Sequence, residues 1–135
     1  MINTSNINNI IWKDIKISVL GAGKSGLAAT KLALSLGAKV LISENDDFID
    51  ITTTPNLELE TGGHSNKILN SYIIIISPGI SDKINIVQKG KELQIPIVSE
   101  IEFSSWFTTS PILAITGSNG KTTTSSLLYE MVKNA

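Results

Sequence analysis

Short runs of β-branched and other apolar residues alternate along the chain with segments whose apolar residues recur at helical spacing. Residues 15–20 form the first run and predict a strand, and the spacing from Leu27 to Leu36 predicts a helix. A second strand is predicted over residues 38–42. This order of strand, helix and strand predicts two parallel strands joined by a right-handed crossover.

The same alternation continues in the second half of the chain. Residues 72–76 are continuously apolar, as expected for a central strand of a parallel sheet that is covered on both faces. An amphipathic helix from Ile84 to Leu93, a strand over residues 96–98 and a short aromatic-rich helix over residues 100–107 are then predicted. We therefore expect an α/β fold with a Rossmann-like, doubly wound parallel sheet.

A small, polar segment that ends in proline, residues 108–111, is the predicted linker between two domains. We expect residues 1–110 to form the Rossmann-like domain. Residues 111–135 are expected to begin a second, truncated domain, with a strand over residues 112–115 and a helix from about Lys121 to Lys133.

Two segments fit no single pattern. The stretch from Phe48 to Gly63 is left open, because residues 57–60 suit a short strand or half a helix equally well. Trp12, with Ile10 and Ile11, is expected to form either a small satellite cluster or an edge strand.

A glycine-rich turn follows the first predicted strand. Gly21, Gly23 and Gly26 have the spacing G-x-G-x-x-G, which permits a tight turn, the close approach of a diphosphate and close helix packing. Glu44 follows about twenty residues later, where a dinucleotide-binding protein places an acid on the ribose hydroxyls. Taken alone, this pattern predicts an NAD site. The alternative is a domain that keeps its glycines for packing and binds nothing there.

Other strand ends carry residues of the same kind. Ligands of open parallel sheets bind outside the carboxyl ends of the strands. We therefore expect the glycine turn, Ser43 with Glu44, and the segment Ser77-Pro78-Gly79 to converge on one crevice.

A second glycine-rich segment lies near the end of the chain. Lys121 and Thr122 directly follow Gly120, so the lysine would neutralise nucleotide phosphates and the threonine hydroxyl would ligate Mg²⁺. The strict phosphate-loop pattern requires a glycine where this chain has Ile115, so the match is partial. A plain strand-to-helix turn is the alternative, but it does not explain a lysine and threonines at a helix start. The predicted phosphate-binding residues are Gly117, Ser118, Asn119, Gly120, Lys121, Thr122, Thr123 and Thr124.

Composition excludes several classes of function. The chain has 135 residues and a formal net charge of −1, so it offers no basic field to nucleic acid. It has no cysteine, and its single histidine, His64, is expected in a surface loop rather than at a metal site. The longest apolar run is too short to span a bilayer, and the first residues do not resemble a secretory signal. We expect a cytoplasmic protein without nucleic-acid or membrane partners.

Four segments resemble the N-terminal part of the Mur ligase family, the ATP-dependent ligases that build the peptide stem of peptidoglycan. They are residues 19–27, 77–80, 99–103 and 114–123. The last is similar to the family's own phosphate loop, which also lacks the first glycine. The Ser-Pro-Gly and Glu-Ile-Glu segments resemble the D-glutamate-adding branch more than the other branches. The resemblance covers nearly the whole chain from Ile15 onward.

The resemblance implies roles for individual residues. Gly23, Lys24 and Ser25 would hold the diphosphate of a UDP-sugar, and Ser43 and Gly79 would lie against its uridine. Glu44 differs from the basic residue that the family often has near this position, but it could still accept a hydrogen bond from the uridine. Residues 118–124 would bind ATP, with Lys121 on its phosphates and Thr122 on Mg²⁺.

The resemblance also implies a reaction. ATP would phosphorylate the carboxylate of UDP-N-acetylmuramoyl-L-alanine, and the amine of D-glutamate would attack the acyl phosphate. The remaining metal ligands and the D-glutamate site lie further downstream in the family. We therefore expect this chain to be a fragment that is inactive alone, and the full-length enzyme to be a monomer.

Two other functions compete with this hypothesis. One is an NAD-binding Rossmann regulatory module whose second loop is fortuitous, and the other is a non-enzymatic chain that only recognises a UDP-sugar. If a second domain is truncated here, apolar residues of its first elements should be exposed. These are Ile112, Leu113, Leu127, Leu128 and Met131.

Overall fold

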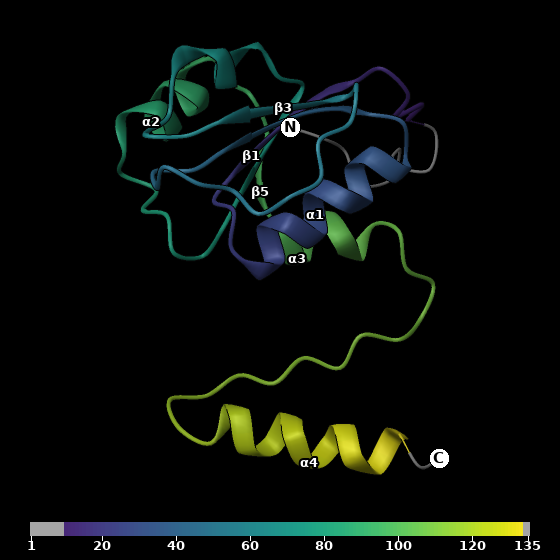
Figure 1. Cartoon of the computed structure of the whole chain (residues 1–135). Coiled ribbons are helices and arrows are strands. Elements are labelled where there is room, and N and C mark those ends of the chain that lie inside the picture. Colours follow the sequence, from purple (N-terminus) through teal and green to yellow (C-terminus); the bar gives the residue numbers. More distant parts are fainter. Residues whose placement is uncertain (1–9, 134–135) are drawn as a thin grey trace.

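The computed structural model describes residues 10–133, and its main feature is a five-stranded parallel sheet with the strand order β3-β2-β1-β4-β5 (Figure 1). This order reverses direction between β1 and β4, as in doubly wound folds, so the predicted fold class is confirmed. The strands are β1 Lys16–Leu20, β2 Lys39–Ser43, β3 Leu57–Glu60, β4 Ile73–Ile76 and β5 Ile97–Ser99.

Helices cover both faces of the sheet. On one face α1 (Lys24–Ser35) lies against α3 (Glu100–Ser105), and the other face carries the 3₁₀ helix η2 (Asn66–Asn70) and α2 (Asn85–Glu92) (Figure 1). Successive side chains of β4 point to opposite faces, so Ile73 packs in the cluster under α1 while Ile74 packs in the cluster under α2. Both side chains are fully buried, as the uninterrupted apolar run predicted.

An aromatic cluster closes the α1 face near the start of the chain. The ring of Trp12 lies 5.8 Å from that of Phe103 and 5.5 Å from that of Phe107, and it stacks on Trp106 at 6.3 Å between centroids. Trp12 is only 6% exposed and belongs to the main core. The prediction of a satellite cluster or edge strand at this residue is therefore wrong, because the rings of α3 and of the two residues after it give Trp12 a place in the principal core.

The segment that the sequence left open contains the edge strand. Leu57–Glu60 pairs with β2 along its whole length, from Val40 opposite Leu57 to Ser43 opposite Glu60. All four of its residues remain half-buried or exposed. An edge strand this short and polar carries little hydrophobic signal, which is why the pattern could not distinguish it from half a helix.

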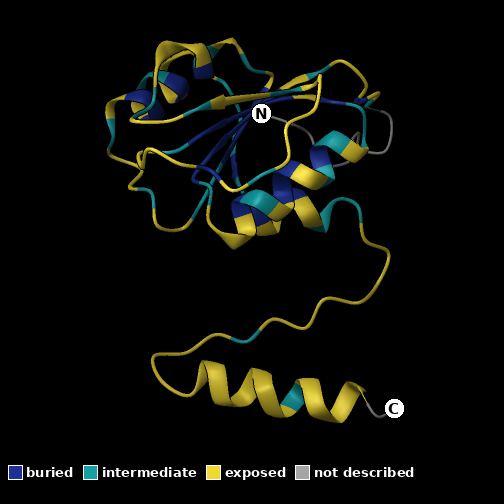
Figure 2. Cartoon of the chain, viewed as in Figure 1, coloured by how far each residue is buried: buried dark blue, intermediate teal, exposed yellow. Residues whose placement is uncertain are grey.

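The last part of the described chain lies apart from the sheet. The helix α4 (Lys121–Lys133) has no buried residue, and Figure 2 shows it exposed almost throughout. Ile112, Leu113, Leu127 and Met131 are exposed as predicted, whereas Leu128 is half-buried.

The strand predicted over residues 112–115 does not form. Its apolar residues are β-prone, but a strand requires a neighbour that shares its backbone hydrogen bonds, and no described strand pairs with this segment. The prediction is wrong for this chain because the sequence pattern registers propensity and not the presence of a pairing partner.

Candidate functional site

The three glycines of the first turn have different environments. Gly21 has φ +95°, and a Cβ there would lie 2.6 Å from the Ser77 hydroxyl oxygen. A Cβ on Gly26 would lie 2.0 Å from the carbonyl oxygen of Gly21, so only glycine lets α1 approach the turn this closely. A Cβ on Gly23 would meet nothing within 4 Å. The outer glycines therefore shape the turn, and the middle one leaves space beside it.

The first turn of α1 is open to an anion. Gly23 is the N-cap residue, no side chain caps the helix, and its first turn contains no acidic residue. By contrast, α3 is capped by the Ser99 hydroxyl, which accepts a hydrogen bond from the backbone N–H of Glu102 at 3.1 Å. The free N–H groups and the positive end of the α1 dipole favour a negatively charged group in front of Gly23.

Ser25 is hydrogen-bonded to a residue that the sequence analysis did not select. Its hydroxyl donates to Oε1 of Glu100 at 3.0 Å, and Glu100 is only 3% exposed. Because a hydroxyl has a single proton, this bond leaves Ser25 only its backbone N–H to offer an anion in front of α1. Nothing in the sequence pattern linked Glu100 to the glycine turn, since 75 positions separate it from Ser25.

Glu44 lies at the end of β2 and is bound to the glycine turn itself. Its Oε2 accepts the backbone N–H of Ala22 at 2.6 Å, and its Oε1 accepts that of Asn45 at 2.7 Å. The hydrogen bond from Ala22 is the main reason that the pKa of Glu44 lies below its ordinary value, with smaller contributions from the backbone N–H groups of Asn45 and Asp46. The carboxylate therefore stays charged and stabilises the turn, while its remaining lone pairs can accept further donors.

Ser43 is fully buried within a polar cluster formed with the loop after β3. Its hydroxyl lies 2.6 Å from Oε2 of Glu60 and 2.8 Å from Nδ1 of His64. Since the carboxylate can only accept, Ser43 donates to Glu60 and accepts from Nδ1–H of His64. Burial disfavours the charged form of Glu60, but hydrogen bonds from Ser43 and Ser65 outweigh it and hold the pKa of Glu60 below its ordinary value.

The third strand end completes this edge of the sheet. The backbone N–H of Ser77 donates to the carbonyl of Leu20 at 3.0 Å, and a Cβ on Gly79 would meet nothing within 4 Å. Gly79 is thus exposed beside the turn, as Gly23 is. Hydrogen bonds from Ala22 to Glu44 and from Ser77 to Leu20 join the ends of β1, β2 and β4, so the structure brings together the three segments that the sequence singled out.

The second glycine segment is not part of this arrangement. Gly117 and Gly120 have φ +151° and +76°, and the Lys121 ammonium donates to the carbonyl of Gly117. Residues 116–124 are exposed and lie with α4, away from the sheet (Figure 2). The loop therefore presents a lysine, two glycines and threonine hydroxyls to solvent.

Two other features are absent from the described part of the chain. Between residues 10 and 133, no group of three or more histidine, cysteine, aspartate or glutamate side chains is arranged to hold a metal ion. Over the same residues, no helix has the length and apolar character needed to cross a membrane. His64, expected in a surface loop, is half-buried and hydrogen-bonded to Ser43.

The strand order and the glycine turn define a Rossmann-like α/β domain. The family model described as the MurD N-terminal domain matches residues 16–86, and the chain belongs to this family. The Mur ligase resemblance seen in the sequence is thereby confirmed.

Individual relatives agree with the family. The chain is 49% identical over 125 residues to UDP-N-acetylmuramoylalanine--D-glutamate ligase of Elusimicrobium minutum, covering 90% of this chain and 28% of that protein. It is 39% identical to the protein of the same name from Chlorobium luteolum, over 87% of this chain and 26% of that one. The chain therefore spans about a quarter of the length of these relatives.

A solved structure shows the same fold. Shikimate dehydrogenase from Aquifex aeolicus superimposes with a TM-score of 0.50 at 18% identity, over 76% of this chain and 49% of that one. At this identity the similarity concerns the fold alone.

Proposed function

We propose that this chain is the N-terminal part of an ATP-dependent ligase that adds D-glutamate to UDP-N-acetylmuramoyl-L-alanine in the cytoplasm, and that its first domain binds the UDP-sugar. The names of the relatives support the reaction. The observation that carries the binding proposal is the uncapped first turn of α1 beside the open space at Gly23.

The diphosphate would be held by the backbone N–H groups of Gly23, Lys24 and Ser25, with the Lys24 ammonium as a point charge. The chain has no arginine, so no guanidinium fork can share this role. Gly79 and the buried Ser43 would lie toward the uridine. Glu44 would accept a uridine hydroxyl or amide proton on an oxygen lone pair that Ala22 and Asn45 leave free.

We also propose the division into a domain over residues 1–110 and the start of an ATP-binding domain over residues 111–135. The exposed lysine and threonines after Gly120 suit the phosphates of ATP and a bound Mg²⁺, which would supply charge neutralisation for phosphoryl transfer. Lys121 would contact the phosphates and Thr122 would ligate the metal. Because the phosphate loop lacks a sheet to hold it here, the isolated chain should not release phosphate from ATP when D-glutamate is added.

Titration calorimetry with UDP-N-acetylmuramoyl-L-alanine and, separately, with NAD⁺ tests the binding proposal. Saturable heat with the UDP-sugar alone is expected, and saturable heat with NAD⁺ alone would instead support a dinucleotide-binding module. The variant Gly23→Val places a branched side chain in the open space, so it should weaken UDP-sugar binding at least tenfold. Because Gly23 has an ordinary φ of −65°, the variant should keep its fold, and Gly23→Ala should be intermediate. Unchanged affinity in Gly23→Val would contradict the proposed diphosphate position.

A further inference from the structure

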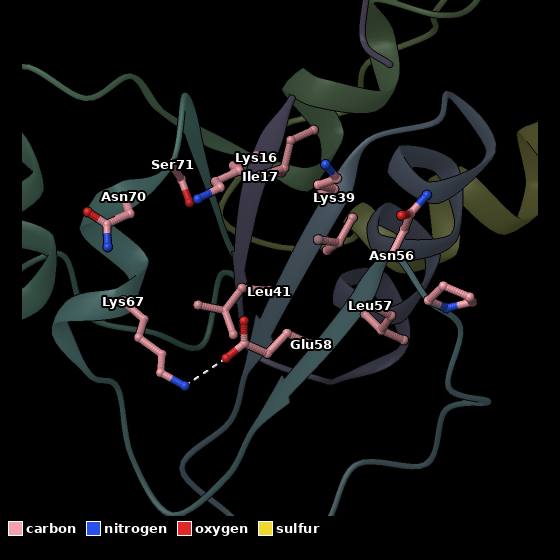
Figure 3. A pocket seen from close by; sticks show the side chains of 12 residues that line it. Lys16, Ile17, Lys39, Leu41, Asn56, Leu57, Glu58, Lys67, Asn70 and Ser71 are labelled. Carbon is pink, nitrogen blue, oxygen red and sulfur yellow. Dashed lines mark hydrogen bonds and ion pairs between the residues drawn. The ribbon is translucent and has the colours of Figure 1, made fainter. Parts of the chain in front are cut away.

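A trough of about 410 Å³ lies at the amino ends of β1, β2 and β3, on the sheet face that carries η2 (Figure 3). It exists because the crossover from β3 to β4 contains only the five-residue helix η2, which packs over β1, where the Ser18 hydroxyl reaches the carbonyl of Ile68 at 3.4 Å. Such a short helix leaves the neighbouring part of β2 and β3 without a full helical cover.

The trough carries more positive than negative charge. Its lining contains three lysines, Lys16, Lys39 and Lys67, and one carboxylate, Glu58. Lys16 and Lys39 are direct register partners in adjacent parallel strands, so their side chains leave the same face side by side. Two like charges in this position repel each other unless an anion lies between or beside them.

The available carboxylates neutralise this cluster only in part. Lys67 pairs with Glu58 at 2.7 Å, and Lys39 pairs with Asp14 at 3.0 Å, but both pairs are largely exposed and hence weak. The pairing with Glu58 raises the pKa of Lys67, so its ammonium stays charged. Lys16 has no ion-pair partner among the described residues.

The remaining lining suits a small molecule rather than a bare ion. Leu41 is 8% exposed and supplies an apolar wall, while Asn70 projects its amide from the end of η2 (Figure 3). The lysines provide point charges and the amide provides directional hydrogen bonds.

We propose that this trough is a second anion-binding site, separate from the glycine turn, and that it takes a small doubly charged anion such as a phosphate monoester or a dicarboxylate. Lys16 stands at the amino end of β1, while the glycine turn follows its carboxyl end. Five residue steps of extended chain separate Lys16 from Gly21, a distance of roughly 16 Å, so ligands at the two sites do not compete for the same groups.

The test follows backbone amide shifts of the whole 135-residue chain by NMR, at constant ionic strength, during titration with inorganic phosphate and with succinate. Saturable shifts are expected around Lys16, Lys39 and Asn70. The double variant Lys16→Gln/Lys39→Gln should weaken this binding at least tenfold, and Lys16→Arg/Lys39→Arg should retain it. Preference for one titrant over the other distinguishes a phosphate from a dicarboxylate ligand.

The control variant Lys31→Gln/Lys83→Gln removes the same charge at sites outside the trough and should bind like the parent chain. The proposal is overturned if no saturable shift occurs or if shifts are confined to residues 21–26. It is also overturned if the glutamine variant of Lys16 and Lys39 and the control variant lose binding equally. Shifts confined to residues 21–26 would contradict the trough but not the proposed UDP-sugar site. Conversely, a chain that fails to bind the UDP-sugar but shows saturable shifts around the trough would contradict only the UDP-sugar proposal.

Discussion

The two glycine-rich loops of this chain use similar residues, but only the first is built into a folded domain. Gly26 lies so close to Gly21 that a single added carbon would overlap its carbonyl oxygen, whereas Gly120 has no atom within 4 Å of such a carbon. The difference arises from their neighbours. The first loop joins a central strand to a helix that packs one face on the sheet, and the second joins an unpaired segment to a helix with no buried residue. The residues of a loop motif thus determine which groups it can present to a phosphate. The elements packed around the loop determine whether those groups are held in a fixed geometry.

Replacing one glycine of each loop with alanine should give the largest difference in the free energy of unfolding. Gly26→Ala should cost about 3 kcal/mol or more of the free energy of unfolding, because backbone atoms must move to admit the new carbon. Gly120→Ala strains a positive φ, but only in an exposed loop that lies away from the sheet. The free energy of unfolding of the sheet domain should therefore change by less than about 0.5 kcal/mol. Urea unfolding followed by both tryptophan fluorescence and far-ultraviolet circular dichroism measures the two variants. Equal losses in the two variants would mean that the second loop is packed as tightly as the first.

An intermediate effect is expected at Glu44 and depends on pH. Its pKa is lowered in the folded chain, chiefly by the hydrogen bond from Ala22, so its stabilising contribution is present above the pKa of the unfolded chain. That contribution disappears as the pH falls through the lower, folded pKa. The parent chain should therefore lose more stability between pH 6 and about pH 3 than Glu44→Gln does.

Urea midpoints across this pH range provide the measurement, and Glu92→Gln at the end of α2 is a matched charge control that should follow the parent chain. If Glu44→Gln shows the same acid sensitivity as the parent, the carboxylate does not hold the turn. Glu60 also has a lowered pKa and remains in the variant, so part of the acid sensitivity should persist.

The smallest effect is expected from removal of residues 111–135. The sheet, its two hydrophobic clusters and the glycine turn all lie before this segment. The shortened chain should keep the unfolding free energy of the parent within about 0.5 kcal/mol and bind the UDP-sugar with unchanged affinity. Calorimetry and urea unfolding of the two chains provide the comparison, and a clear loss of either property would show that the two loops depend on each other.

The sequence predicted those parts of the fold in which local pattern and tertiary packing agree. Ile73 to Ile76 are apolar because both faces of β4 are covered, and the spacing of Gly21, Gly23 and Gly26 follows directly from the strand-turn-helix geometry. The strand predicted over residues 112–115 does not form, because its apolar residues have no pairing strand in the described chain. There the local pattern and the tertiary packing disagree.

The finer geometry of the site depends on long-range contacts that no local pattern contains. The hydrogen bond from Ser25 to Glu100 joins α1 to α3, and the hydrogen bond between His64 and Ser43 joins the loop after β3 to β2. The sequence placed Glu44 at the correct strand end. Its hydrogen bond from the backbone N–H of Ala22 became apparent only in the three-dimensional structure. Residue types thus indicated which groups are available, and the tertiary structure determined which of them are already engaged.

The aromatic cluster around Trp12 has a practical consequence for spectroscopy. The chain has two tryptophans, and both belong to this cluster, Trp12 stacked on Trp106. Selectively excited tryptophan emission therefore monitors the core beneath α1 and α3 and does not report fraying of α4, which contains Tyr129 but no tryptophan. Far-ultraviolet circular dichroism detects that fraying. A dichroism signal that begins to fall before the emission changes would separate melting of the terminal helix from collapse of the sheet within one sample.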